Sequence, residues 1–242
     1  MKIFSHVVLV FFIFLTFLSS VHASYKASIA QMVVYAENRD KGVLIDFVKA
    51  LEKYSNKKIS YVVVPFKRSL ENVIMRKVHF HMPLIALPPQ KAKKLNFDYS
   101  TETIFHVNFV IFFNKSKNVT KNNYHKFKVE TDFAHIEFFD KSVKSSTNIE
   151  GSLKKVNSGR IDAFIFADNA TYPFIKKNNL KNIKSSLYER FDVKIILPKG
   201  ERGKEVDNFL SETIKKMRRS GEFNKIMDKI DLPYKNLDII SP

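Results

Sequence analysis

The feature that most constrains the fold of this chain is an alternation of short strand patterns and amphipathic helix patterns near its start. Residues 29–35, 59–64 and 81–87 are apolar runs of strand length, and the segments between them carry apolar residues at three- and four-residue spacing. The first of these helical stripes consists of Leu44, Phe47, Val48 and Leu51. The second predicted helix covers residues 70–75, with Ser69 as its cap. Parallel strands need a crossover that a helix supplies, so this order predicts a mostly parallel sheet flanked by helices.

A second α/β unit follows the first. Residues 107–113 are almost continuously apolar, which is typical of a strand covered on both faces. Further strand patterns alternate with helix patterns: the strands are predicted at 128–139, 161–166 and 191–197, and the helices at 150–156, 171–177, 204–218 and 221–230. The sequence contains no flexible linker. We therefore expect two lobes that are joined by short rigid crossings and close around a ligand by a hinge motion.

The N-terminus has the features of an export signal. Lys2 precedes an apolar run over residues 7–18, and small residues follow it up to Ala23. The run is shorter than the roughly 20 apolar residues of a membrane-spanning helix, which favours a cleaved signal over a membrane anchor. The chain has no cysteine, so it can carry neither a lipid on a cysteine nor a disulfide. We predict that residues 1–23 are a removed signal peptide and that the protein is periplasmic and not a lipoprotein.

The chain is strongly basic. It has 41 Lys and Arg against 24 Asp and Glu, a formal net charge of +17. Clustered positive charge attracts nucleic acids, membrane surfaces or anionic solutes. Here the charges are spread over every segment, which is typical of a solvated surface, and no nucleic-acid-binding motif accompanies them. We expect no nucleic-acid partner, and an anionic ligand stays open.

Five short motifs resemble those of the family 3 extracellular solute-binding proteins, which include the polar amino acid binding proteins of ABC importers. They follow the family's order over nearly the whole chain after Ala23. They are Gly42-Val43-Leu44-Ile45-Asp46, Pro65-Phe66-Lys67-Arg68, Phe97-Asp98-Tyr99-Ser100, Ser158-Gly159-Arg160-Ile161-Asp162-Ala163 and Gly221-Glu222-Phe223. The resemblance implies a type II periplasmic-binding fold. It also implies a discontinuous first lobe, residues 24–104 and 192–242, and a second lobe, residues 105–191.

The chain departs from the amino acid binders of this family where they contact the ligand. Those proteins carry an arginine in a Thr-x-x-Arg pattern that holds the ligand carboxylate, whereas residues 88–93 of this chain contain no arginine. Asp168 lies one position after the aspartate that commonly meets the ligand's amino group. The resemblance therefore implies capture of a small-molecule solute, and the departures argue against an α-amino acid.

In the first lobe, candidate ligand contacts lie where predicted strands end, because ligands of such sheets bind beyond the carboxyl ends of the strands. These residues are Tyr35, Glu37, Phe66, Arg68, Met82 and Pro83. The Arg68 guanidinium can bind a carboxylate or phosphate through two hydrogen bonds; a surface pair with Glu71 is the alternative. Tyr35 can stack on a ligand, although a place in the core is the commoner fate of an aromatic residue.

In the second lobe the candidates are Ser146, Thr147 and Asp168. Ser146 and Thr147 precede a predicted helix, so their hydroxyls and the free backbone amides can receive an anion. An ordinary helix cap is the alternative. Asp168 follows a predicted strand and is the better acidic candidate. Together with Arg68, these residues favour a small polar or anionic solute.

No catalytic or cofactor-binding motif is present, so we expect no catalytic residues and no cofactor. His79 and His81 share one face of a predicted strand, but no third ligand accompanies them, so we expect no metal site. We predict a monomeric binding protein that serves an inner-membrane ABC permease. Two alternatives stay open: a secreted enzyme similar to cyclohexadienyl dehydratase, with Glu37 or Asp168 as its acid, and a ligand-sensing module for a membrane receptor.

Overall fold

The computed structural model describes residues 24–236, and the predicted signal peptide lies outside this range. Within it, eight strands form one mixed sheet in the order β2-β1-β3-β8-β4-β7-β5-β6. The strands are β1 (Tyr25–Ala30), β2 (Ile59–Val64), β3 (Phe80–Ile85), β4 (Phe97–Asn114), β5 (Val129–Asp132), β6 (Lys144–Ser146), β7 (Ala163–Ala167) and β8 (Ile183–Pro198). The helices are α2 (Val43–Ser55), α3 (Phe66–Ile74), α4 (Pro89–Ala92), α5 (Ile149–Asn157), α6 (Asp168–Lys177), α7 (Glu201–Arg219) and α8 (Glu222–Met227), and the 3-10 helices are η2 (Tyr124–Lys126) and η3 (Phe133–Phe138).

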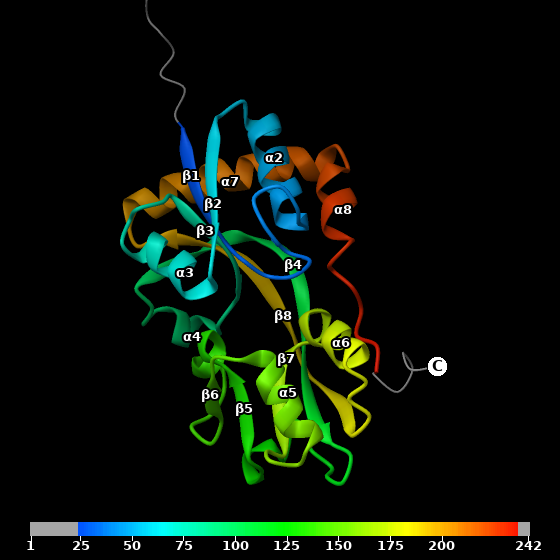
Figure 1. Ribbon diagram of the computed structural model, residues 1–242. Helices are drawn as coiled ribbons and strands as arrows, with labels where there is room; N and C mark the ends of the chain where they lie inside the picture. Colours follow the sequence, from blue (N-terminus) through cyan, green and yellow to red (C-terminus); the bar gives the residue numbers. More distant parts are fainter. Residues whose placement is uncertain (1–23, 237–242) are drawn as a thin grey trace, which may run out of the picture.

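Two long antiparallel strands, β4 and β8, run through the molecule and connect its two halves (Figure 1). In the first half, β1 pairs in parallel with β2 and β3, and β3 joins β8. In the second half, β5 pairs in parallel with β6 and β7, and β7 joins β4. Helices α2, α3, α7 and α8 lie in the first half, and α5 and α6 lie in the second (Figure 1). The predicted α/β fold with two mostly parallel halves is confirmed, and the halves share one continuous sheet.

The core forms where the sequence places its apolar stripes. In α2 the predicted stripe is buried, and this helix packs against α7 and α8. In α7, Val206, Leu210 and Met217 are buried, whereas the predicted stripe residue Phe209 is only partly buried. β4 carries an unbroken buried run over residues 107–113. This strand joins the buried residues of the two halves into one continuous apolar cluster.

Two predicted elements in the first half are wrong in their boundaries. β1 ends at Ala30, and a turn closed by a bridge between Met32 and Ala36 takes the place of the last predicted strand residues. Helix α3 begins at Phe66, so Ser69 lies inside it and is not its cap. The buried Ser69 hydroxyl instead lies 2.9 Å from the Ser28 hydroxyl and 2.6 Å from Nδ1 of His81.

The second half also contains a local difference. The predicted strand at 128–139 divides into β5 and the 3-10 helix η3. Asp132 causes the break, because its side chain accepts a hydrogen bond of 2.9 Å from the amide of Ala134 and caps η3. The break turns the following residues out of the sheet, so that His135 packs against Phe109 instead of extending a strand.

Candidate functional site

A cleft between the two halves, here named the interlobe cleft, is lined by six rings together with other apolar side chains. The lining rings are Tyr35, Phe66, Phe105, Phe109, His135 and Phe166, and the other lining residues are apolar. The cleft contains about 330 Å³ of space, part of it open to solvent. Tyr35 and Phe66 come from the first half, whereas His135 and Phe166 come from the second. A solute in this cleft would contact both halves.

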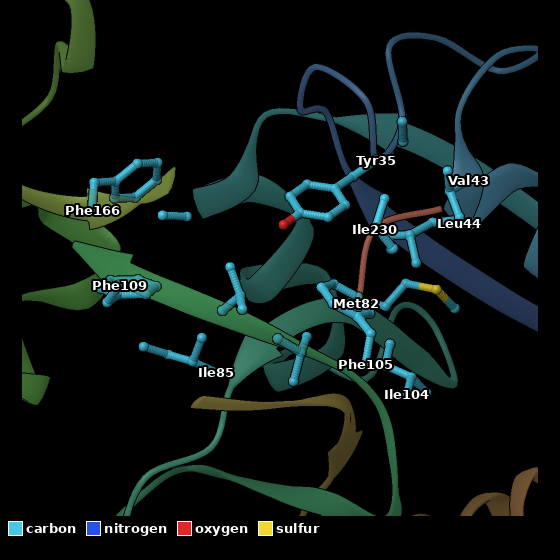
Figure 2. Packing of buried hydrophobic residues seen from close by; sticks show 14 of the residues in the cluster. Tyr35, Val43, Leu44, Met82, Ile85, Ile104, Phe105, Phe109, Phe166 and Ile230 are labelled. Atoms are coloured by element: carbon cyan, nitrogen blue, oxygen red, sulfur yellow. The ribbon is translucent and has the colours of Figure 1, made fainter. Parts of the chain in front are cut away.

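The loop after β1 places Tyr35 at the cleft. The backbone carbonyl of Tyr35 accepts a hydrogen bond of 2.8 Å from the amide of Leu44, and the Tyr35 ring stacks on Phe105 with 5.3 Å between centroids. Gly42 lies directly against this loop: a Cβ on it would lie only 2.4 Å from the carbonyl oxygen of Tyr35. Figure 2 shows the Tyr35 hydroxyl pointing toward the side where Phe109 and Phe166 lie. The first turn of α2 thus fixes the loop and its ring.

Direct contacts join the halves across the cleft. The amide nitrogen of the Asn169 side chain donates a hydrogen bond to the Tyr35 hydroxyl. Burial raises the pKa of the Tyr35 phenol, so this hydroxyl stays protonated. The Phe66 ring also approaches His135, with 5.8 Å between centroids. The two halves are therefore closed onto each other in this structure.

Phe66 and Arg68 lie in the first turn of α3 but face different surroundings. Phe66 packs edge to face on the buried His81, with 5.4 Å between centroids. Burial lowers the pKa of His81 to about 3, so this imidazole is neutral near pH 7. Arg68 is exposed and forms no hydrogen bond or ion pair with any described residue, Glu71 included. Its predicted contact with a ligand stays a prediction.

The other candidates of the first half have different positions. Pro83 lines the cleft together with Tyr35 and Phe66, whereas the Met82 side chain is fully buried and is not part of the lining. Glu37 lies in the surface turn before α2, where its carboxylate pairs with Lys41 at 2.8 Å. The structure therefore does not bring Glu37 to the interlobe cleft.

Ser146 and Thr147 lie at the start of α5, away from the cleft lining. The Ser146 hydroxyl accepts a hydrogen bond of 2.8 Å from the Ser152 hydroxyl, and Thr147 is exposed. Asn148 caps the helix, because its side-chain oxygen accepts from the amide of Gly151 at 2.8 Å. The hydroxyl of Ser146 thus braces the helix start.

Asp168 is the first residue of α6 and lines a second cavity, named here the hinge cavity, with about 620 Å³ of space. The Asn108 side chain donates to the Asp168 carboxylate at 3.0 Å, and the Asn169 amide does so at 2.7 Å. Burial raises the pKa of Asp168, and these hydrogen bonds oppose the shift. Asp168 therefore faces a different space from Tyr35.

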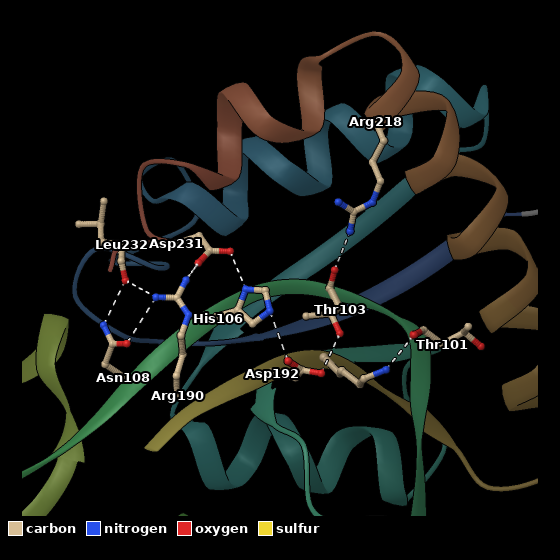
Figure 3. Close-up of polar contacts among 10 residues, drawn as sticks. Thr101, Thr103, His106, Asn108, Arg190, Asp192, Arg218, Asp231 and Leu232 are labelled. Atoms are coloured by element: carbon tan, nitrogen blue, oxygen red, sulfur yellow. Dashed lines mark hydrogen bonds and ion pairs between the residues drawn. The ribbon is translucent and has the colours of Figure 1, made fainter. Parts of the chain in front are cut away.

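A polar network ties the C-terminal segment to the crossing strands beside the hinge cavity (Figure 3). The His106 ring lies between two carboxylates, 3.3 Å from Asp192 and 2.9 Å from Asp231. Arg190 pairs with Asp231 and donates to the carbonyl of Leu232 at 2.9 Å. This segment continues from α8 toward α6, where the Tyr172 hydroxyl donates to the carbonyl of Lys235 at 2.9 Å (Figure 1). It forms a third connection between the halves.

The sequence interpretation missed four lining rings: Phe105, Phe109, His135 and Phe166. Phe109, Phe166 and His135 lie in the predicted strands at 107–113, 161–166 and 128–139, and no local pattern marks them as ligand contacts. The available signal is the abundance of phenylalanine: the chain has 23 phenylalanines in 242 residues, and Phe105, Phe109, Phe112 and Phe113 lie close together in one mostly apolar run.

Among residues 24–236, no three His, Asp or Glu side chains cluster as ligands for a metal ion. His79 precedes β3 and accepts a hydrogen bond of 2.9 Å from the Lys26 amide, while His81 is buried. No helix in the same range has the length and apolarity to span a bilayer.

Comparison with known proteins supports the fold assignment. The family model of the bacterial extracellular solute-binding proteins, family 3, matches residues 22–230. No curated protein matches the sequence.

Solved structures of several functional kinds share the fold. A histidine kinase sensor domain with similarity to periplasmic binding proteins has a TM-score of 0.68 at 14% identity, over 85% of this chain and 94% of that chain. The arginine-, lysine-, histidine-binding protein of Geobacillus stearothermophilus has a TM-score of 0.67 at 15% identity, over 90% and 99%. An ancestral amino acid-binding protein, a precursor of cyclohexadienyl dehydratase, has a TM-score of 0.63 at 18% identity, over 86% and 95%.

Proposed function

Because this chain belongs to the bacterial extracellular solute-binding proteins, family 3, we propose that it captures a small solute in the interlobe cleft and presents it to an inner-membrane ABC importer. One observation carries this proposal: the cleft is lined by Tyr35 and Phe66 from one half and by His135 and Phe166 from the other. A solute that contacts both halves has a higher affinity for the closed form than for the open form. It therefore shifts the population toward the closed form. The predicted export signal is consistent with capture in the periplasm.

The proposed hinge lies where β4 and β8 cross between the halves, at the predicted lobe boundaries, residues 104–105 and 191–192. Phe105 pairs with Val193 and His106 with Asp192, and the register of the ladder shifts between Thr103 and Phe105. Such irregularities bend a strand. They support a hinge at this level of the sheet, with residues 24–104 and 192–242 moving against residues 105–191.

The enzyme alternative requires an acid beside the bound solute. Glu37 pairs with Lys41 in a surface turn, and Asp168 faces the hinge cavity. Neither carboxylate lines the interlobe cleft, so no observation favours this alternative. The sensory alternative uses the same binding step with a receptor in place of the permease, and the binding test below applies to both.

A distance measurement between spin labels tests solute-driven closure. The chain has no cysteine, so Lys53→Cys and Lys176→Cys place one label on α2 and one on α6 at exposed positions. A panel of amino acids, dicarboxylates and small aromatic compounds is added in turn. We expect one class of solute to narrow the distance distribution toward the closed form.

The matched control carries both labels on the first half, at Lys53→Cys and Lys215→Cys, which are exposed on α2 and α7. Its distances should not respond to any solute. If no solute changes the distance between the halves, and calorimetry detects no binding, the proposed function is wrong.

A further inference from the structure

We infer that the solute of the interlobe cleft is an uncharged aromatic molecule that carries one N–H or O–H donor, as phenols and indoles do. This inference rests on the proposed function and specifies the ligand class of the same site. It differs from the polar or anionic solute expected from Arg68 and Ser146, because neither residue lines the cleft.

The rings of the cleft form a connected aromatic surface. In the second half, the His135 ring lies 5.2 Å from Phe109 and 5.5 Å from Phe166, both edge to face. Tyr35 of the first half stacks on Phe105, which lies where β4 crosses between the halves, with 5.3 Å between centroids. Aromatic pairs favour such offset and edge-to-face geometries. A flat ring that enters between these two groups would find faces and edges on both sides.

The composition of the lining disfavours an ionic solute. None of the described residues around the cleft is a lysine, arginine, aspartate or glutamate. A carboxylate or ammonium group enclosed here would lose its hydration and find no lysine, arginine, aspartate or glutamate of the lining as a counter-charge, which is unfavourable. Amino acids and dicarboxylates therefore fit this lining poorly, whereas a neutral ring loses little on leaving water.

His135 supplies the polar contact. It is only 5% exposed, and neither of its ring nitrogens forms a hydrogen bond with a described residue. The Asp132 carboxylate lies 3.3 Å from Nδ1, and a carboxylate at this nitrogen favours the tautomer with its proton on Nδ1. Nε2 is then left as an acceptor. A solute with one N–H or O–H group satisfies it, which is the reason for the donor in the proposed ligand.

Indole is a suitable probe because the chain contains no tryptophan. Fluorescence excited beyond the tyrosine absorption band then comes from indole alone, and a titration with the purified protein measures binding directly. We expect saturable binding of indole and weaker binding of N-methylindole, which lacks the donor. L-arginine, L-glutamate and indoleacetate should not compete.

Two variants assign the binding to the cleft. Phe66→Ala removes a lining ring and should weaken indole binding roughly tenfold. Phe133→Ala is its control, because Phe133 is 49% exposed and lies outside the lining. His135→Phe keeps a ring and removes the acceptor, so it should weaken indole binding by about tenfold and leave N-methylindole binding unchanged.

The outcomes separate this inference from the proposed function. If L-arginine or L-glutamate binds and closes the labelled halves while indole does not, the ligand class is wrong and the proposed function holds. Equal affinities of indole and N-methylindole would overturn the role of His135. If no probe binds or closes the halves, the proposed function and the inference are both wrong.

Discussion

Replacing Gly42 by alanine tests whether close backbone packing holds the loop that presents Tyr35. Gly42 has φ of 140° and ψ of 153°, a conformation that is essentially restricted to glycine. A Cβ would lie 2.4 Å from the carbonyl oxygen of Tyr35 and 2.6 Å from Cα of Ala36. Both are backbone atoms, so no side chain can rotate away. In Gly42→Ala the loop must move and carry the Tyr35 ring with it.

The expected loss of stability has two parts. The strained backbone conformation costs about 1–3 kcal/mol, and displacement of packed backbone adds about 1–3 kcal/mol. We therefore expect Gly42→Ala to lower the free energy of unfolding by about 2–6 kcal/mol. Gly221→Ala is the matched control. Gly221 has φ of 79°, but no atom lies within 4 Å of an added Cβ, so only the left-handed strain of about 1–2 kcal/mol applies.

Thermal and urea unfolding, followed by circular dichroism, measure both losses. For a chain of this size, 1 kcal/mol lowers Tm by about 2–4 °C, so Gly42→Ala should melt about 4–24 °C below the unaltered protein. Equal losses in the two variants would show that the contact between Gly42 and the Tyr35 loop contributes nothing. In that case the loop is held by its other contacts, such as the stacking on Phe105.

Three further predictions concern single side chains. Tyr35→Phe removes the hydroxyl that accepts a hydrogen bond from the Asn169 side chain, so it should destabilise the closed form by about 1 kcal/mol. The distance distribution between the labelled halves should then broaden in the absence of solute, and an unchanged distribution would contradict this. Because the pKa of His81 is lowered to about 3, the unfolded chain takes up a proton below its ordinary pKa of about 6.5 that the folded chain does not. Between pH 8 and pH 5, the free energy of unfolding of the unaltered protein should thus fall by about 2 kcal/mol more than that of His81→Asn. Urea unfolding of both proteins measures this, and parallel pH profiles would argue against it. Arg190→Ala removes the hydrogen bond to the carbonyl of Leu232, so amide hydrogen exchange should become faster in residues 231–236 and stay unchanged in β1; unchanged exchange in both would mean that other contacts hold this segment.

Most of the fold could be predicted from the sequence because its signals are local. The stripe of α2 and the apolar run of β4 each require only that one face, or both faces, be covered. Pattern and burial therefore agree at Leu44, Phe47 and Val110. Element boundaries were less accurate, since one side chain can shift them. Asp132 ended a predicted strand by capping η3, and no periodicity records such a hydrogen bond.

The sequence by itself determined the alternating α/β order and the family to which the chain is similar. Only the tertiary structure decided which side chains line the cleft. Tyr35 and Asn169 are 134 positions apart, and Phe66 meets His135 across the halves. Charge and strand-end position favour Arg68, and a place before a predicted helix favours Ser146. The structure leaves Arg68 exposed on α3, and the Ser146 hydroxyl braces α5. The lining depends on which distant segments face one another after the two halves pack together. No local sequence pattern records that arrangement.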